Sequence, residues 1–149
     1  MDNAQPHTPL RCYVMGEQSL TIRCAELLRE AGHAVLGLIS DAAAVVAWAR
    51  ERAIPVLDPG SDYAEALREE PFDYFFSIAN LRIVPEPVLA LPRRAAINFH
   101  DGPLPAYAGL NVPAWALMNR EPAHGVTWHL MEARVDAGGI LVQRTFPVA

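Results

Sequence analysis

Lysine is absent from this 149-residue chain, and 12 arginines carry all of its positive charge. Asp and Glu together number 17, so the formal net charge is −5 at pH 7. A protein that binds nucleic acid in general carries a basic patch or stripe, and the arginines here form no cluster. The composition therefore disfavours a general nucleic-acid surface; a local patch for a tRNA stays open, although no arginine cluster indicates one.

The chain also lacks long apolar runs and has few cysteines. No run approaches the roughly 20 apolar residues that span a bilayer. The first residues, MDNAQPHTPLRC, do not have the basic-then-apolar layout of a secretory signal. Cys12 and Cys24 fall on an expected strand and helix, which favours two small buried residues in a reducing compartment over a disulfide. We therefore expect a cytoplasmic protein without a membrane partner.

Two binding motifs are missing as well. A dinucleotide site needs a G-x-G-x-x-G pattern after the first strand, so that the backbone can approach the pyrophosphate. The corresponding turn, MGEQSLTIR, has one glycine, Gly16, and the acidic Glu17 beside it would repel phosphate. The His, Cys and carboxylate residues show no ligand-type spacing, so we expect no metal site. These patterns disfavour dinucleotide and metal chemistry.

Apolar residues make up 52% of the chain, and they are arranged in alternating strand-like and helix-like segments. Asp41 is expected to cap the second helix, and Gly32 to end the first. We expect strands at 10–16, 33–40, 54–59, 72–80, 95–99, 125–131 and 140–148, helices at 19–31, 41–53 and 61–70, and a short helix or turn at 85–92. This alternation predicts an α/β fold with a Rossmann-like open, mostly parallel sheet flanked by helices. One domain at 10–149 would follow a flexible leader at 1–9.

Polar side chains mark the end of the fifth expected strand. Asn98 and His100 point to the same face of that strand, and its carboxyl end is where open α/β sheets place their ligands. A loop with three prolines and two glycines follows, up to Asn119. An Asn amide can stabilise a developing oxyanion and a His can move protons, while a carboxylate such as Asp136, in a later loop, can orient the imidazole. Each residue also has a simpler interpretation: Asn98 as a turn cap, His100 as a core histidine and Asp136 as an Asx turn.

Several motifs in the second half resemble the folate-dependent formyltransferases. They are NFH at 98–100, PLPAYAG at 103–109, GVTWH at 125–129 and DAGG at 136–139. Their order and spacing agree with that family over about residues 72–149, whereas the first 70 residues agree only in their strand and helix rhythm. The resemblance implies that Asn98, His100 and Asp136 are the catalytic residues.

The resemblance also implies 10-formyltetrahydrofolate as the donor and an amine as the acceptor. The pterin would lie between segment 77–84 and the loop around Asp136, held largely by backbone groups. The residues expected to bind it are Ile78, Asn80, Leu81, Arg82, Ile83, Val84, Ala137 and Gly138. The acceptor could be a carrier-bound starter unit of an assembly-line enzyme, a tRNA, a nucleotide or a sugar amine. A hydrolase that releases formate and a non-catalytic scaffold domain are the alternative functions.

Two departures from the family pattern stand out. Relatives carry H-x-S-L-L-P, whereas this chain has HDGPLP, so Gly102 replaces the serine and Asp101 adds a charge at the mouth of the site. The family's domain also continues with helical structure after the last strand. We therefore expect the chain to be a domain cut from a longer polypeptide, or a minimal version of one.

Overall fold

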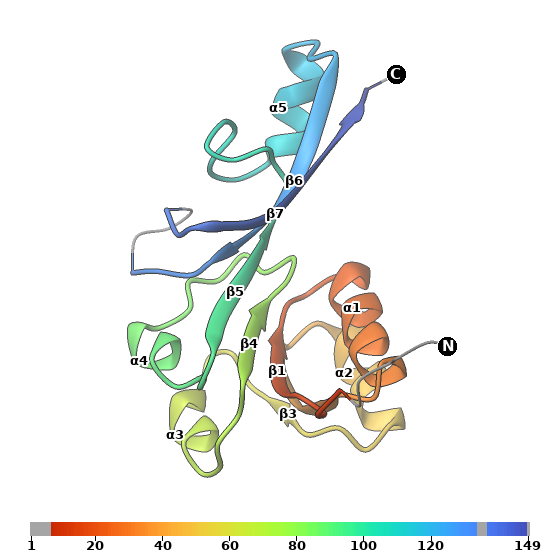
Figure 1. Ribbon diagram of the computed structural model, residues 1–149. Coiled ribbons are helices and arrows are strands. Elements are labelled where there is room, and N and C mark those ends of the chain that lie inside the picture. Colours follow the sequence, from red (N-terminus) through yellow and green to blue (C-terminus); the bar gives the residue numbers. More distant parts are fainter. Residues whose placement is uncertain (1–6, 134–136, 149) are drawn as a thin grey trace, which may run out of the picture.

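Seven strands form one sheet in the order β3-β2-β1-β4-β5-β6-β7 (Figure 1). The computed structural model describes residues 7–133 and 137–148. The first five strands run parallel, and the last two run antiparallel to their neighbours. The strands are β1 Arg11–Met15, β2 Ala34–Ile39, β3 Val56–Leu57, β4 Tyr74–Ser77, β5 Ala95–His100, β6 Ala123–Leu130 and β7 Ile140–Pro147. The expected α/β class with a mostly parallel sheet is confirmed.

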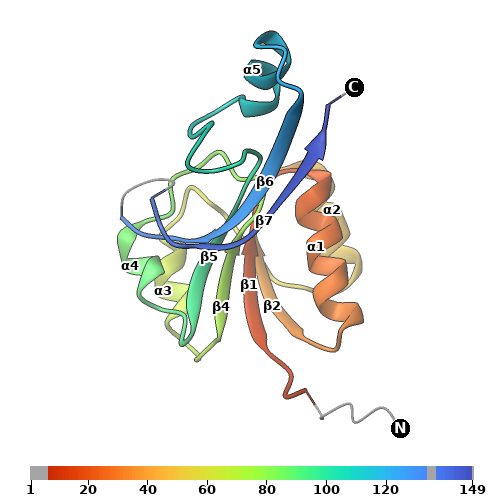
Figure 2. The same cartoon turned by 45° about the horizontal axis from the view of Figure 1, so that its top comes forward.

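Helices cover both faces of the parallel part of the sheet (Figures 1 and 2). They are α1 Ser19–Glu30, α2 Ala43–Glu51, α3 Tyr63–Leu67, α4 Glu86–Leu89 and α5 Val112–Met118. On one face α1 and α2 pack on a cluster that includes Val14, Leu38 and Ile78. On the other face α3 and α4 pack on a cluster that includes Met15 and Phe75. Because both faces are covered, the central strands are almost entirely apolar.

Strands β2 and β3 are added on one side of β1, and the chain then crosses from β3 to add β4 on the other side, so the strand order reverses between β1 and β4. Such a switch point opens a crevice at the carboxyl ends of the strands. Gly16 lies at this point, and a Cβ there would collide with the carbonyl of Ile78 and the side chain of Thr21. The Thr21 hydroxyl donates a hydrogen bond to that carbonyl at 2.7 Å. The glycine therefore allows the start of α1 to pack closely on the end of β4.

Two local predictions were wrong. The residues between β5 and Asn119 were expected to form a loop, but they contain α5, with Pro113 in the first turn, where a missing N–H does no harm. Asp41 does not cap α2: the helix begins after Ala42, whose N–H donates to the Ser40 hydroxyl at 3.2 Å. The Asp41 carboxylate instead accepts a hydrogen bond from Arg82 at 2.7 Å.

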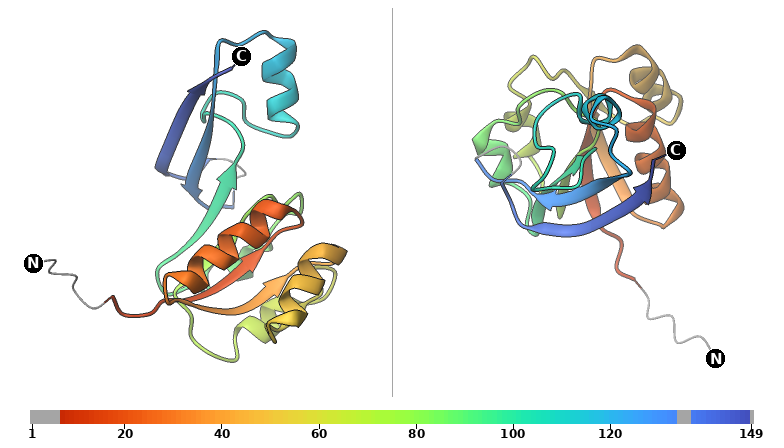
Figure 3. Two further views of the ribbon diagram at one scale, coloured as in Figure 1. Left: turned by 90° about the vertical axis from the view of Figure 1, so that its right-hand side faces the viewer. Right: turned by 90° about the horizontal axis from the view of Figure 1, so that it is seen from above.

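The antiparallel pair β6 and β7 extends beyond the parallel sheet, and α5 lies beside its far end (Figure 3).

Within the described part of the chain, no helix is long and apolar enough to cross a bilayer. Cys12 and Cys24 are free thiols, and burial raises the pKa of Cys12 to about 11. That thiol therefore stays protonated at neutral pH and is a poor nucleophile.

Candidate active site

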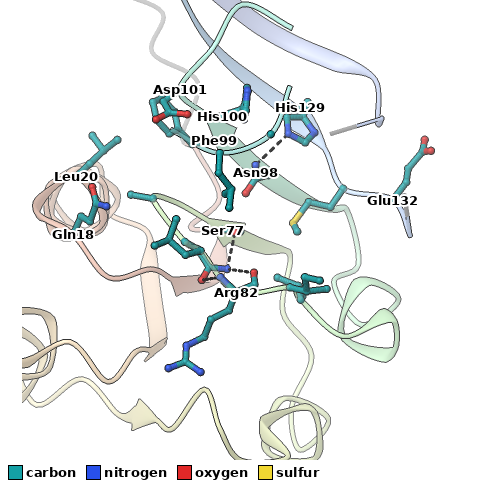
Figure 4. A pocket seen from close by; sticks show the side chains of 18 of the residues that line it. Gln18, Leu20, Ser77, Arg82, Asn98, Phe99, His100, Asp101, His129 and Glu132 are labelled. Atoms are coloured by element: carbon teal, nitrogen blue, oxygen red, sulfur yellow. Dashed lines mark hydrogen bonds between the residues drawn. The ribbon is translucent and has the colours of Figure 1, made fainter. Parts of the chain in front are cut away.

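A cavity of about 600 Å³ opens at the carboxyl ends of β1, β4 and β5 (Figure 4). Its walls come from the turn before α1, the segment after β4, the end of β5 and residues 109–111 and 131–133. The volume is within the usual range of small-molecule sites. Asn98 and His100 both line it, as their shared strand face predicts.

The orientation of the Asn98 amide follows from its neighbours on β6. Asn98 pairs with His129 across the antiparallel ladder, and Asn98 Nδ2 lies 3.2 Å from His129 Nε2 (Figure 4). His129 Nδ1 lies 2.9 Å from the Leu130 carbonyl oxygen, which can only accept. Nδ1 therefore carries the proton of the neutral ring, and Nε2 accepts from Asn98. The second N–H of the Asn98 amide can then donate to a ligand.

The structure places His129 in the cavity wall, with 2% of its surface exposed. Its contact with Asn98 depends on the register between β5 and β6. That register is set by pairing between distant segments, so a pattern in one segment does not reveal it. In the sequence, only the GVTWH motif points to His129 as part of the site.

His100 is the last residue of β5, and 6% of its surface is exposed. Its Nε2 atom lies 2.6 Å from the backbone carbonyl oxygen of Tyr107. Tyr107 belongs to the loop at 101–111 between β5 and α5, called the proline loop below. Because a carbonyl only accepts, this contact places a proton on Nε2 in both the neutral and the charged ring.

The segment after β4 forms a second wall of the cavity. Among the residues expected to bind the donor, Asn80, Leu81, Arg82, Ile83 and Val84 all line it. The Asn80 side chain donates to the Ser77 hydroxyl at 3.1 Å and to the Arg82 carbonyl at 3.0 Å. It also accepts from the Arg82 backbone N–H at 3.1 Å. These bonds hold the segment in one conformation.

Charged groups at this wall are already paired or lie at the rim. Figure 4 shows the Arg82 side chain pointing away from Asn98, and its guanidinium forms ion pairs with Asp41 and Glu17. Asp101 and Glu132 also line the cavity. Within the described lining, the carboxylates of these last two residues therefore make the rim acidic.

The structure does not place the other three expected donor residues in the cavity. Ile78 packs in the core under α1, with its N–H bonded to the Met15 carbonyl and its own carbonyl to Thr21. Gly138 is buried against the backbone of Leu130, leaving no room for a side chain. Ala137 is exposed and does not belong to the described lining.

Asp136 lies outside the described residues, so its expected place beside His100 stays a prediction. Among the residues that are described, no group of three or more His, Cys, Asp or Glu side chains is arranged to hold a metal ion.

The proline loop is attached to β6 by the hydroxyl of Thr127, a contact that the sequence reasoning missed. Thr127 is fully buried; its hydroxyl donates to the Gly102 carbonyl at 2.7 Å and accepts from the Leu104 N–H at 3.2 Å. Gln143, on β7, donates to the same hydroxyl at 3.0 Å and to the Leu104 carbonyl at 2.7 Å. The threonine of the GVT motif therefore fixes the loop that covers His100.

Gly102 is required by this close packing. A Cβ at this position would lie 2.8 Å from both the Tyr107 carbonyl oxygen and Val112 Cγ1, and 2.9 Å from His100 Nε2. Contacts this short force the backbone to move, because the carbonyl cannot rotate away alone. The loop of this chain therefore has no space for the serine that the family pattern carries.

Comparison with known proteins identifies the family. The formyl transferase family model matches residues 30–149, far more than half of the chain. The chain belongs to the formyl transferase family. Its relatives in this family include the methionyl-tRNA formyltransferase of Geobacter sulfurreducens, 34% identical over 108 residues, which cover 70% of this chain and 34% of that protein. The methionyl-tRNA formyltransferase of Bacteroides fragilis is 28% identical over 94% of this chain and 48% of its own length.

The chain thus spans about a third to a half of the length of these curated relatives. Among solved structures, glycinamide ribonucleotide transformylase 1 from Symbiobacterium toebii is similar to it with a TM-score of 0.80 and 28% identity. That similarity covers 95% of this chain and 74% of the other. The family is therefore shown by sequence, and the fold agrees with it.

Proposed function

We propose that this chain transfers a formyl group from 10-formyltetrahydrofolate to an acceptor amine. The observation that carries the proposal is the position of Asn98 and His100, side by side on one wall of the cavity at the sheet edge. Family membership supports formyl transfer as the reaction. The donor is the one that the resemblance to folate-dependent formyltransferases implies.

The two side chains suit the two demands of this reaction. The acceptor nitrogen bonds to the formyl carbon while the bond from that carbon to the donor nitrogen breaks. The Asn98 amide would donate a hydrogen bond to the formyl oxygen as negative charge develops, an effect typically worth about 10²–10³ in rate. His100 would take a proton from the attacking nitrogen and return one to the leaving nitrogen, typically worth about 10²–10⁴. Asp136 would orient the imidazole, as the resemblance implies.

The donor would lie along residues 79–84. This wall combines backbone groups with the apolar side chains of Leu81, Ile83 and Val84, which suit one face of a flat ring. The first two of these side chains are exposed, at 66% and 82%, so they are available to a ligand. The hydrogen bonds of Asn80 hold the wall in place before the donor binds, which lowers the entropic cost of binding.

The acceptor is defined here only as an amine. The candidates are methionyl-tRNA, a nucleotide amine, a sugar amine and an amine on a carrier protein. The acidic rim formed by Asp101 and Glu132 favours a positively charged amine over a phosphate near the reacting carbon.

Product analysis on the full-length protein tests the function. The protein is incubated with 10-formyltetrahydrofolate and each candidate acceptor, and the formylated product and free formate are measured by mass spectrometry. We expect a formylated amine with one acceptor, and a loss of about 10²–10³ in rate for Asn98→Ala. Formate without any formylated acceptor would show a hydrolase instead. A well-folded protein that does not bind a stable folate analogue in calorimetry would show a scaffold and end the proposal.

A further inference from the structure

Tyr107 has an unusual backbone conformation at a position that touches His100. Its φ angle is +57°, in the left-handed region that bulky side chains rarely adopt. In this conformation its carbonyl oxygen lies 2.6 Å from His100 Nε2. Conformations of this kind persist only where the surrounding contacts hold them.

The contacts of the Tyr107 phenol keep the backbone in this conformation. The Tyr107 hydroxyl donates to Glu121 Oε1 at 2.6 Å, and Asn119 Nδ2 donates to the hydroxyl at 3.1 Å. The hydrogen bond to Glu121 raises the pKa of Tyr107, which keeps the phenol protonated as the donor. The ring also packs edge-on against His124, with the centroids 5.9 Å apart. The side chain is thus fixed at the turn between α5 and β6, which follows the proline loop.

From these contacts we infer that Tyr107 is a positioning residue for His100. The bond from its phenol to Glu121 holds the left-handed backbone, and the backbone carbonyl in turn holds the Nε2 proton of His100. The imidazole is thereby fixed in one orientation, with a proton on Nε2. The part of this inference that concerns catalysis rests on the proposed formyl transfer, whereas the part that concerns the imidazole does not.

Gly102 supports the same assignment, because it lies next to both His100 Nε2 and the Tyr107 carbonyl oxygen. The approach of Tyr107 to His100 is so close that the intervening residue has no room for a Cβ. Thr127 fixes the carbonyl of Gly102, so the start of the loop is held independently of the phenol. Loss of the phenol contact should therefore release the Tyr107 carbonyl without freeing the whole loop.

The experiment compares three variants of the full-length protein by two readouts. Tyr107→Phe removes only the hydroxyl, Glu121→Ala removes only its acceptor, and Glu121→Gln keeps an acceptor oxygen. Tyr74→Phe, on β4, is the matched control, because the hydroxyl of Tyr74 makes no hydrogen bond to another described residue. The first readout is the Nε2–H signal of His100 in ¹⁵N-histidine NMR spectra, assigned with His100→Gln. The second is kcat against KM for formyl transfer.

In the wild type, in Glu121→Gln and in Tyr74→Phe we expect an Nε2–H signal that is protected from exchange with water. In Tyr107→Phe and Glu121→Ala we expect exchange about tenfold faster and kcat about tenfold lower, the factor for one hydrogen bond, with KM for the donor unchanged. A merely structural role would lower the melting temperature without changing the Nε2–H signal. If Tyr107→Phe does not fold, Glu121→Ala decides the outcome.

Two results would overturn the inference. One is a wild-type His100 without a proton on Nε2, and the other is an unchanged Nε2–H signal in both Tyr107→Phe and Glu121→Ala. If the wild type transfers no formyl group at all, the proposed function fails while the NMR comparison still tests the positioning role.

Discussion

At the scale of single residues, the site depends on backbone carbonyls that can only accept hydrogen bonds. The Leu130 carbonyl sets the tautomer of His129, and this ring in turn sets the orientation of the Asn98 amide. The Tyr107 carbonyl sets the proton on His100 Nε2 in the same way. Groups that are oriented before the substrate binds need no reorganisation during the reaction, which is the main source of electrostatic stabilisation in active sites.

Gly102→Ser tests how closely the proline loop packs on His100. Although the family pattern has serine here, we expect this variant to lose formyl transfer, because its Cβ would approach the Tyr107 carbonyl oxygen to 2.8 Å. Overpacking of this kind typically costs about 1–3 kcal/mol. Denaturant unfolding measures the loss of stability, and turnover measures the loss of formyl transfer. Gly109→Ser cannot serve as a control, because Gly109 has a φ of +100°, which strains any residue with a side chain. Higher turnover in Gly102→Ser would show that the loop has room that this structure does not have.

At the scale of the elements, the strand–helix alternation could be predicted because hydrophobic spacing is a local property of the sequence. The shared face of Asn98 and His100 followed from the two-residue period of a strand. The contacts of His129 and Thr127 could not be predicted, because they depend on how β5 pairs with β6 and on the path of the loop. The helix α5 was missed because its proline was taken as a loop signal.

Thr127→Val tests the attachment of the proline loop to β6. Valine keeps the shape of the side chain but removes the hydroxyl, so the Gly102 carbonyl and the Leu104 N–H lose their shared partner. The Leu104 N–H still donates to the Gly102 carbonyl at 3.1 Å, so we expect the free energy of unfolding to fall by about 0.5–1.5 kcal/mol for each hydrogen bond of the hydroxyl that is lost. Thr127→Ser keeps the hydroxyl and is the control. Urea unfolding measures both variants; equal stability would mean that the hydroxyl contributes nothing.

At the scale of the whole molecule, the two ends of the sheet have different tasks. The carboxyl ends of β1, β4 and β5 carry the cavity, whereas the amino ends are joined by the carboxylate of Asp73. This group accepts from the Arg11 backbone N–H at 2.9 Å and from the Arg93 guanidinium at 3.0 Å. The hydrogen bond from Arg11 and the charge of Arg93 lower the pKa of Asp73, although burial opposes them.

A lowered pKa links this contact to pH. The carboxylate stabilises the fold above its unfolded pKa, near 4, and this contribution is lost as the pH falls through the lower folded value. We expect Asp73→Asn to be less stable than the wild type at pH 7, with a difference that shrinks in acid, and with little change in formyl transfer. Urea unfolding at pH 7 and pH 3 measures this, with the exposed Asp62→Asn as the control. A stability difference that does not depend on pH would contradict the assignment.

The most direct test of the central claim is the rate of formyl transfer by His100→Ala at saturating donor and acceptor. Asn98, the walls of the cavity and the donor segment are unchanged in this variant, so a stable folate analogue should bind as it does to the wild type. Removal of the proton-transfer group should lower turnover by about 10²–10⁴-fold. Wild-type turnover in a folded His100→Ala protein would contradict the claim that the imidazole at the end of β5 carries the reaction.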